Sequence, residues 1–598
     1  PQYMQEYWYK HEVYTYVLLD NPQRKGEIEK EFPVMAEKYK TEEALKNKIW
    51  GVSLIPLADI HLQPQVGYEA ETKGNRSAMI ALIFAAVAIL AIAWINYINL
   101  AVARSMERAK EVGVRRVVGA FRKQLVSQFL FEALLMNLIA FVLAVGLIEV
   151  VLPYFNQLVG RTVTFSVWLA GYWWILLVTV FIAGIFLSGY YPALALLNRK
   201  PITLLRGKFL HSKSGECTRK VLVVIQYTAS MILLCGTLIV FAQLSFMRNQ
   251  SLGVKTGQTL VVKFPGHTEG MNTKLEAMKK AISRLPLVHK VTFSGAVPGE
   301  EVATFLSNRR TNDVLKQNRL YEMLACDPDY VDAYGLTVVA GRGFSEEYGD
   351  DVDKLVINET AVRNLGFTSN DEAIGQQVTV ECTDAPMQII GVVKDYHQQA
   401  LSKNYTPIML IHKDKIDWLP QRYISVVMKS GDPRELVSQV EEIWHRYFED
   451  SSYDYFFLDQ FFDHQYRQDE AFGVMIGSFT GLAIFISCLG LWVLVMFSCT
   501  TRTKEMGIRK VLGASRFNLF FQLGKGFFLL ILIAVLIALP VAWFSMDTWL
   551  SHYAFRTELK GWFFILPVVL MLLISFVTVA CQTMNIILSK PARSLRYE

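Results

Sequence analysis

The residues whose types and spacing could do chemistry lie in two short segments that share one pattern of charges and glycines. Residues Arg108–Ala120 recur as Arg502–Ala514, with eight of thirteen positions identical and no gap. The shared pattern is Lys-Glu-x-Gly-x-Arg-(Arg/Lys)-Val-x-Gly-Ala. It is typical of a short amphipathic helix that a glycine ends, and such a helix binds a partner surface or anionic lipid. The chemistry that this pattern indicates is docking.

Each residue type in the pattern has an expected part in docking. The acidic and basic residues form a charged side, the valines at 112, 114, 117 and 118 supply apolar positions, and the second glycine caps the helix. The glycines also allow a partner to approach closely. Lipid binding by the basic residues is the alternative, but retention of the pattern in two copies favours docking. The predicted docking residues are Lys110, Glu111, Gly113, Arg115, Arg116, Gly119, Lys504, Glu505, Gly507, Arg509, Lys510 and Gly513.

No catalytic or metal-binding residues are predicted. The sequence contains no Gly-x-x-x-x-Gly-Lys-Ser/Thr phosphate loop, so we expect no ATP hydrolysis by this chain. Its ten histidines show no paired metal-ligand spacing, and His397 is expected to be structural. The run Ser188–Pro192 is expected to be a packing and kink site in a membrane helix. A disulfide between Cys326 and Cys382 stays an open alternative.

Seven apolar stretches are long enough to cross a bilayer, which takes about 20 helical residues. Five of them contain no charged residue. Glu132 and Lys525 lie inside the other two, where charges are costly and often functional. Because each lies near the cytosolic end, separate snorkelling is favoured over the alternative, a charge pair across a pseudo-twofold axis. The stretches are Ser77–Ala103, Gln124–Leu152, Trp173–Leu197, Val221–Met247, Ala471–Thr501, Phe517–Ser545 and Gly561–Ser589.

Lys and Arg concentrate in alternate connections between these stretches. The predicted cytoplasmic connections and the C-terminal tail carry 22 of them, against three in the two short connections on the other side. By the positive-inside rule, the C-terminus lies in the cytoplasm, and residues 1–76 and 248–470 lie outside it. The predicted fold class is a polytopic α-helical membrane protein of two four-helix units, seven helices being present, with an α+β extracytoplasmic domain.

The repeat predicts two copies of one unit. Lys200–Arg206 and Lys590–Arg596 end the two sets of helices at an offset of 390 residues, close to the 394 of the docking segments. A weaker match pairs a strand at 13–19 and a following charged helix with the strand Tyr423–Met428 and its helix. We therefore expect that a further helix and most of a first external domain precede Pro1. The expected domains are 1–76, the end of that first external domain; 77–206, the first helical unit, with its docking segment at 104–123; 207–247, a cytosolic linker and the first helix of the second unit; 248–470, the external domain; and 471–598, the rest of the second unit, with its docking segment at 502–516.

The region between residues 248 and 470 mixes strand-like and helical runs, which predicts a compact α+β domain. The aromatic-rich run Tyr453–Phe472 is expected to be the stalk that leads back into the bilayer. The strand-like runs are Thr259–Phe264, Leu355–Asn358, Ile389–Val393 and Tyr423–Met428, and the helical ones are Met271–Arg284 and Pro433–Tyr447.

The docking segments resemble the coupling-helix region of FtsX-like permease domains, which docks into a cleft of a cytosolic ATPase. The external region resembles the MacB-like periplasmic core domain, which implies an inserted subdomain over 305–400. The motifs that carry this second resemblance are Gly341-Arg-Gly-Phe, Ile357-Asn-Glu-Thr-Ala, Asn364-Leu-Gly and Gly391-Val-Val-Lys-Asp-Tyr-His. The chain departs from MacB because no ATPase is fused to it and two units share one chain, as in the eight-helix permeases common in Bacteroidota.

The resemblance implies a permease subunit of a type VII, mechanotransmission ABC transporter in the inner membrane. Its partner would be a separate cytosolic ABC ATPase, as a homodimer, which would hold ATP and Mg²⁺, whereas this chain would hold no cofactor. Efflux of antimicrobial peptides, drugs or related periplasmic substrates is the expected function. A periplasmic adaptor or outer-membrane protein and membrane lipid are further expected partners, and nucleic acid is not. The alternatives are a subunit for lipoprotein release or for regulation of cell-wall hydrolases, and a membrane sensor or scaffold.

Overall fold

The chain divides into two compact units in a computed structural model. The helical unit comprises residues 77–249 and 467–598, and the sheet unit comprises residues 1–76 and 250–466. The structure describes residues 15–39, 51–60, 76–107, 109–164, 173–190, 193–194, 197, 213–265, 271–302, 304–313, 318–380, 383–399, 403–416, 418–419, 421–449, 451–501, 508–509 and 511–588.

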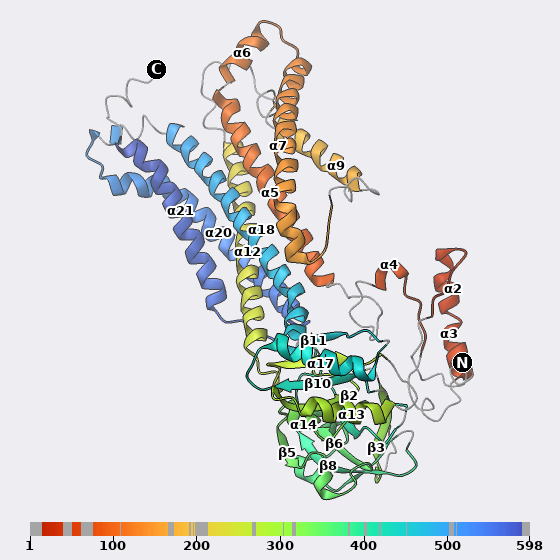
Figure 1. The fold of residues 1–598 in the computed structure, drawn as a ribbon. Coiled ribbons are helices and arrows are strands. Elements are labelled where there is room, and N and C mark those ends of the chain that lie inside the picture. Colours follow the sequence, from red (N-terminus) through yellow and green to blue (C-terminus); the bar gives the residue numbers. More distant parts are fainter. Residues whose placement is uncertain are drawn as a thin grey trace. The chain divides into compact units, whose positions relative to one another are not determined.

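Among these residues, seven helices are long and apolar enough to cross a membrane, as predicted. The short helix α6 (Ala109–Val117) lies between the first two (Figure 1). The helix α18 extends beyond its apolar stretch, because the predicted stalk is helical from Leu458 onward and continues without a break into the span. The seven helices are α5 (Arg76–Glu107), α7 (Arg122–Val159), α9 (Trp173–Ile185), α12 (Lys213–Asn249), α18 (Leu458–Thr501), α20 (Arg516–Leu550) and α21 (Trp562–Leu588).

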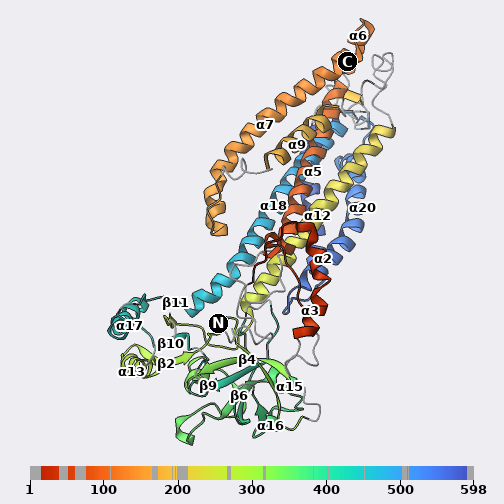
Figure 2. The same cartoon turned by 90° about the vertical axis from the view of Figure 1, so that its right-hand side faces the viewer.

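A polar seam joins α12 to α18. The hydroxyl oxygens of Ser230 and Ser487 lie 2.7 Å apart, and those of Thr237 and Thr480 lie 2.6 Å apart. A side chain at Gly477 would reach within 3.2 Å of the ring of Phe241, so the small residue allows close approach. Small residues and interhelical hydrogen bonds hold membrane helices together, because lipid tails remove the hydrophobic drive for association. Figure 2 shows α18, α5 and α12 running alongside one another.

The predicted kink site forms a π-helical turn, η2 (Phe186–Tyr190), directly after α9. Ser188 and Gly189 are buried there, and Asn137 of α7 donates a hydrogen bond to the hydroxyl of Ser188 (3.1 Å). A Cβ atom at Gly189 would lie 2.9 Å from the Cβ of Ala133, so only glycine fits this contact. The packing and kink prediction is therefore confirmed for residues 188–190, and Tyr191 and Pro192 lie outside the described residues.

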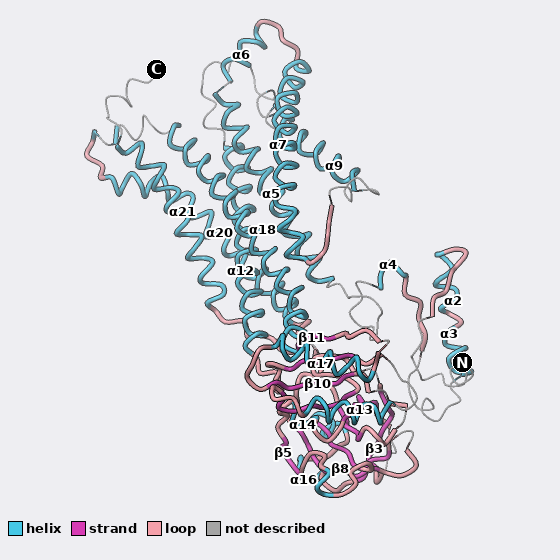
Figure 3. The backbone as a smooth tube through the Cα atoms, in the orientation of Figure 1, coloured by secondary structure: helices cyan, strands magenta, loops and turns pink. Residues whose placement is uncertain are grey.

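The sheet unit contains an open sheet and a small barrel built from one set of hydrogen-bonded strands. The open part has the order β11-β1-β10-β2, with α13 (Met271–Ser283) and α17 (Pro433–Tyr447) packed against it (Figure 3). The barrel closes because β4 and β9 pair in parallel at the ends of the path β4-β3-β7-β8-β6-β9. The strands are β1 (Thr259–Lys263), β2 (Val288–Ser294), β3 (Phe305–Arg310), β4 (Arg319–Cys326), β5 (Val338–Gly341), β6 (Lys354–Asn358), β7 (Gln377–Thr379), β8 (Met387–Val393), β9 (Ile408–His412), β10 (Tyr423–Met428) and β11 (Tyr455–Phe457).

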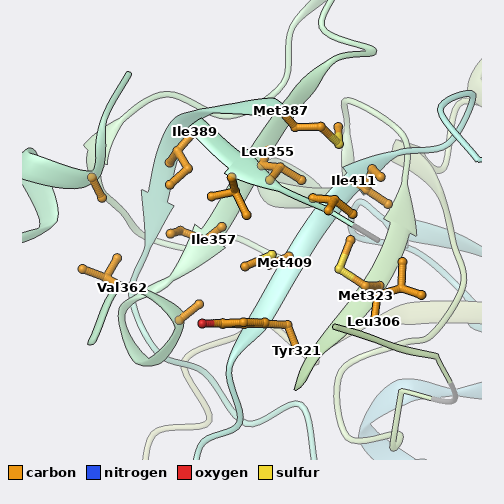
Figure 4. Close-up of a cluster of buried hydrophobic side chains, with 14 of the residues drawn as sticks. Leu306, Tyr321, Met323, Leu355, Ile357, Val362, Met387, Ile389, Met409 and Ile411 are labelled. Carbon is orange, nitrogen blue, oxygen red and sulfur yellow. The ribbon is translucent and has the colours of Figure 1, made fainter. Parts of the chain in front are cut away.

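Apolar side chains fill the barrel. Figure 4 shows Tyr321, Met323, Leu355, Ile357 and Met409 pointing toward one another from several strands. All five are 0–1% exposed, and burial of each of the four Met, Leu and Ile side chains stabilises the fold by about 1.5–3 kcal/mol. The barrel strands come from residues 305–412, so the inserted subdomain expected over 305–400 extends further, through the closing strand β9.

Two smaller expectations about the sheet unit have clear outcomes. Cys326 is a free, buried thiol, and Cys382 lies outside the described residues. His397 is 2% exposed, and its ring packs against that of Tyr405 with centroids 4.7 Å apart and the planes tilted by 43°, as expected of a structural histidine. Burial lowers the pKa of His397 to about 4, so it is neutral at physiological pH.

The strand predicted over residues 13–19 is wrong where the structure describes it, because residues 15–19 are not in a sheet. Its counterpart β10 is held between β1 and β2, whereas Leu18 is 99% exposed. The helix predicted to follow is confirmed only in pieces, because a turn at Lys30–Glu31 divides it whereas α17 is continuous, but both helical segments begin at the same kind of cap. Asn21 Oδ1 accepts from the Gln23 N–H, and Asp432 Oδ1 accepts from the Arg434 N–H, both at 2.9 Å. The other elements near this end are η1 (Pro22–Arg24), α2 (Lys25–Glu29), α3 (Phe32–Tyr39) and α4 (Leu57–Ile60).

Candidate coupling site

The first docking segment folds as the helix α6 and ends at a glycine, as predicted. Gly119 has φ +102°, the left-handed conformation that glycine adopts without strain. The Ala120 N–H donates to the Arg115 carbonyl (2.9 Å), and the Gly119 N–H donates to the Arg116 carbonyl (3.3 Å). These two hydrogen bonds make a Schellman cap.

The second docking segment ends in the same way where the structure describes it. Gly513 has φ +89°, and the Ala514 N–H donates to the Arg509 carbonyl (3.0 Å). The helix α20 then starts at a Ser515 cap, whose hydroxyl accepts from the Asn518 N–H (3.2 Å). Lys504, Glu505, Gly507 and Lys510 lie outside the described residues, and so does the side chain of Lys110.

One side of α6 packs against the rest of the helical unit. Val112 is 5% exposed and forms a small apolar cluster with Leu125 of α7 and with Ala193 and Leu197, which follow the third span. Gly113 is buried beside it. Arg116 Nη1 donates to the carbonyl of Leu197 (3.1 Å), which ties the C-terminal turn of α6 to the same place. The helix is therefore fixed to two neighbouring segments by both apolar and polar contacts.

A chain of side-chain contacts also leads from α6 into α7. Arg115 forms an ion pair with Glu111 (2.7 Å), and its Nη1 donates to Gln128 Oε1 (2.8 Å). Gln128 Nε2 in turn donates to Glu132 Oε1 (3.1 Å). The predicted docking residues Glu111 and Arg115 are thus brought together with the predicted intramembrane carboxylate. Sequence reasoning missed Gln128, although the repeat offset of 394 places Gln522 at the equivalent position.

The other side of α6 is an exposed apolar ridge that occurs in both copies. Val114, Val117 and Val118 are 51%, 65% and 82% exposed. Their equivalents in the second copy are 53%, 65% and 79% exposed; these are Ile508, Val511 and Leu512. We call these two sets of three residues the apolar ridges. The three valines of α6, together with Val118 directly after it, therefore divide between an inner contact and an outer face.

Glu132 and Lys525 have different surroundings. Glu132 accepts from Gln128 of its own helix, whereas Lys525 lines an apolar groove between α20 and α21. The charge pair across a pseudo-twofold axis stays a prediction.

The outer ends of α12 and α18 enter one sheet. The strand β11 directly precedes α18, and it pairs antiparallel with β1, the first strand after α12. The linker before β1 is held as well, because the Lys255 N–H donates to the Tyr334 carbonyl (2.8 Å) and the His397 N–H donates to the Leu252 carbonyl (3.0 Å).

The first turns of α18 belong to the core of the sheet unit. Leu458 and Phe462 are 0% and 3% exposed and pack with Tyr330 and Tyr334. Gly299, with φ +90°, lies under the ring of Phe462, where a Cβ atom would come within 2.8 Å. Its carbonyl accepts from Gln465 Nε2 (2.7 Å). The start of α18 is therefore clamped to the loop after β2.

Two family profiles match the chain. The FtsX-like permease C-terminal family matches residues 83–201 and again residues 477–591, and the MacB-like periplasmic core domain matches residues 229–443. The first helical match contains α6, and the second contains the segment that Gly513 ends.

Similar proteins include two transporter components. The uncharacterized ABC transporter permease YvrN of Bacillus subtilis (strain 168) is 21% identical over 221 residues, which is 34% of this chain and 52% of that protein. The macrolide export ATP-binding/permease protein MacB of Campylobacter jejuni subsp. jejuni (strain 81-176) is 32% identical over 139 residues, which is 23% of this chain and 21% of that protein. The match thus spans about half the length of the first relative and about a fifth of the second.

A solved structure is also similar to part of the chain. The extracellular domain of the ABC-type transporter YknZ from Gram-positive bacteria matches at 16% identity, with a TM-score of 0.25. The match covers 33% of this chain and 97% of that domain.

Proposed function

Because this chain belongs to the MacB/FtsX family of ABC transporter permeases, we propose that it converts ATP hydrolysis by a separate cytosolic ATPase into motion of its extracytoplasmic domain. The single observation that carries this proposal is the pair of equivalent apolar ridges beside equivalent glycine caps. Exposed apolar patches next to charges mark interaction surfaces. Two such surfaces in one chain fit the two subunits of an ATPase homodimer.

The ridges supply most of the expected binding energy. Burying three valine-sized side chains at each ridge contributes about 1.5–3 kcal/mol per side chain. The neighbouring charges of Glu111 and Arg115 are already satisfied by each other and by Gln128, so they add register and orientation to the contact. The equivalent residues of the second copy are assigned the same part.

The contacts on the inner side of α6 support transmission of the ATPase movement. A helix held only by its ends would bend under a force from a bound partner. In contrast, α6 contacts its neighbours through Val112 and, one turn later, through Arg115 and Arg116. Packed interiors resist compression and transmit strain. ATP-driven approach of the two ATPase subunits would therefore displace α7 and its neighbours instead of bending α6.

The route outward runs through α18, which is one helix from the core of the sheet unit to the cytosolic end of its span. We assign the extracytoplasmic domain to the periplasm and the chain to the inner membrane. One relative is a macrolide exporter by name, and we propose efflux of drugs, antimicrobial peptides or related substrates taken up outside the cytoplasm, with a periplasmic adaptor or outer-membrane protein as a further partner. ATP and Mg²⁺ would bind the ATPase alone.

The test is co-purification of the cognate ABC ATPase with variants of the ridges. Val117→Glu with Val118→Glu, combined with Val511→Glu and Leu512→Glu, should weaken binding at least ~100-fold, since each ~1.4 kcal/mol is tenfold. Stimulated ATP turnover should be lost as well. The matched control combines Val117→Ile with Leu512→Ile, which keeps both ridges apolar and should leave binding intact. Full co-purification of the glutamate variant, inserted normally in the membrane, would refute the assignment.

A further inference from the structure

The groove between α20 and α21 combines one cation with apolar walls. It has a volume of about 400 Å³. Lys525 is the basic residue in its lining. The walls that matter below are Phe521, Phe528 and Leu532 of α20, and Val568 and Leu572 of α21.

Lys525 can reach the level of the cytosolic headgroups. It lies nine residues along α20 and inside the apolar stretch Phe517–Ser545, and a lysine side chain in that position can extend toward the cytosolic interface. Among the described residues that line the groove, none carries a carboxylate. An ammonium group at the edge of a bilayer costs free energy unless it meets an anion or water.

The part of the groove that follows Lys525 has the length of one leaflet. The lining residues on α20 run from Phe521 to Val535, and the ten residues from Lys525 to Val535 span about 15 Å of helix. Half of a hydrocarbon core of ~30 Å is also about 15 Å. A ligand with its anion on Lys525 and an acyl chain along Phe528 and Leu532 would therefore match the groove in both charge and length.

We infer that this groove binds an anionic phospholipid of the cytoplasmic leaflet, with its phosphate on Lys525 and one acyl chain against α20 and α21. Basic pockets between membrane helices on the cytoplasmic side take anionic headgroups in this way. The second copy alone has this cation, because the equivalent residue of the first copy is Phe131, which is 67% exposed. The inference depends on the membrane topology and is independent of the proposed ATPase contact.

The bound lipid would brace the second half of the helical unit. It would lie between α20 and α21, nine residues along the helix from the start of α20 at Arg516. The cap at Ser515 and the ridge residues before it connect directly to that helix end. Occupancy of the groove would thus hold α21 to the helix that follows the second docking segment.

The experiment uses the full chain in vesicles of phosphatidylcholine that contain a small fraction of photo-activatable phosphatidylglycerol, with the reactive group on the acyl chain. Labelled peptides are mapped by mass spectrometry. We expect labelling of α20 and α21 in the wild type, about five-fold less in Lys525→Gln, and full labelling in Lys525→Arg, since one basic residue near the surface contributes about that factor. Lys560→Gln removes the same charge at the other end of these helices and should change nothing.

A second variant keeps the lysine and fills the groove. Leu532→Trp should reduce labelling of α21 as strongly as Lys525→Gln does. If size-exclusion chromatography shows that Lys525→Gln is misfolded, Leu532→Trp alone tests the inference. The inference fails if a photo-activatable phosphatidylcholine labels the groove as strongly as phosphatidylglycerol does. It also fails if both Lys525→Gln and Leu532→Trp, correctly folded, are labelled like the wild type.

Discussion

Asn96 and Gly490 occupy equivalent positions in the two copies of the unit, and they lie against each other. A Cβ atom at Gly490 would come within 2.9 Å of Asn96 Oδ1, and the Asn96 amide donates to the Ile486 carbonyl (3.3 Å). In a twofold interface, only residues beside the axis meet their own equivalents. A pseudo-twofold axis that relates the two copies would therefore pass between α5 and α18 at this level.

Replacing Gly490 should loosen that contact. Gly490→Val would push on Asn96 Oδ1 and on Gln226 Nε2, which also lies 2.9 Å from the Cβ position and donates to the Ser487 carbonyl. We expect a loss of about 1–3 kcal/mol, the usual cost of overpacking, measured as a lower midpoint of thermal unfolding in detergent. Gly481→Ala is the matched control on the same helix, since nothing lies within 4 Å of its Cβ position. Equal midpoints for the two variants would contradict the contact.

Acidic pH should stabilise the barrel through Glu322. This carboxyl is 1% exposed and accepts from Gln399 Nε2 (2.6 Å), and burial raises its pKa to about 7. The folded protein therefore keeps the proton to about pH 7, whereas the unfolded chain releases it near pH 4.5. Stability falls as pH rises through this window, by about 3 kcal/mol in total.

Glu322→Gln should remove this dependence. Hydrogen exchange of β4 at pH 8 should be slower in Glu322→Gln than in the wild type, and the two should agree near pH 4.5. Glu442→Gln, on the exposed face of α17, is the control and should behave like the wild type. A wild-type β4 that exchanges with the same stability at pH 5 and pH 8 would contradict the assigned pKa.

Charge reversal in the docking segments should detach the ATPase. Arg115→Glu with Arg509→Glu places a carboxylate beside Glu111 and against Gln128, so α6 loses its brace and gains repulsion. We expect loss of ATPase co-purification while the permease still inserts. Gln128→Leu with Gln522→Leu is the matched variant, because it cuts the link to α7 and leaves the apolar ridges intact. It should retain the ATPase but lower stimulated turnover. If the ATPase still co-purifies with the arginine variant, Arg115 and Arg509 do not take part in the contact with the ATPase.

A charge swap tests the intramembrane pair. Because Glu132 is engaged by Gln128 and Lys525 lines the groove beside α21, we expect Glu132→Lys with Lys525→Glu to be no better than either single change. Stimulated ATP turnover and thermal stability are the measurements. Rescue by the double change would instead establish the pair across the pseudo-twofold axis.

The sequence predicted those features whose cause is local. Long uncharged apolar runs can be stable only as buried or membrane helices, and glycine at 119 and 513 ends a helix because it alone adopts a positive φ cheaply. The π-turn after α9 was foreseen as a kink at Ser188, although its helix type was not. The constant offset of 394 residues between the repeats showed in addition that the two docking segments are equivalent, which no local pattern could show.

Features that depend on distant partners could not be predicted. The parallel pairing of β4 with β9 joins residues about 90 positions apart, so no local pattern marks the barrel closure. Residues 13–19 have strand-like composition, but a strand forms only where neighbours supply hydrogen bonds. Val112 faces inward and Val114 outward because Leu197, about 85 residues later in the chain, packs against Val112. The repeat also places a glutamine at the position of Gln128 in both copies, but only the hydrogen bond from Arg115 shows what Gln128 does.

The pairing of β1 with β11 limits how α12 and α18 can move. Three residue pairs join these strands, and a slip by one residue would turn every side chain of β11 to the opposite face. Leu458 and Phe462 could then no longer stay in the core, so such a slip amounts to local unfolding. The outer ends of the two helices are therefore linked through these paired strands. Under the proposed function, axial thrust carried by α18 would act on β1 as well as on β11, and so on the strand that follows α12.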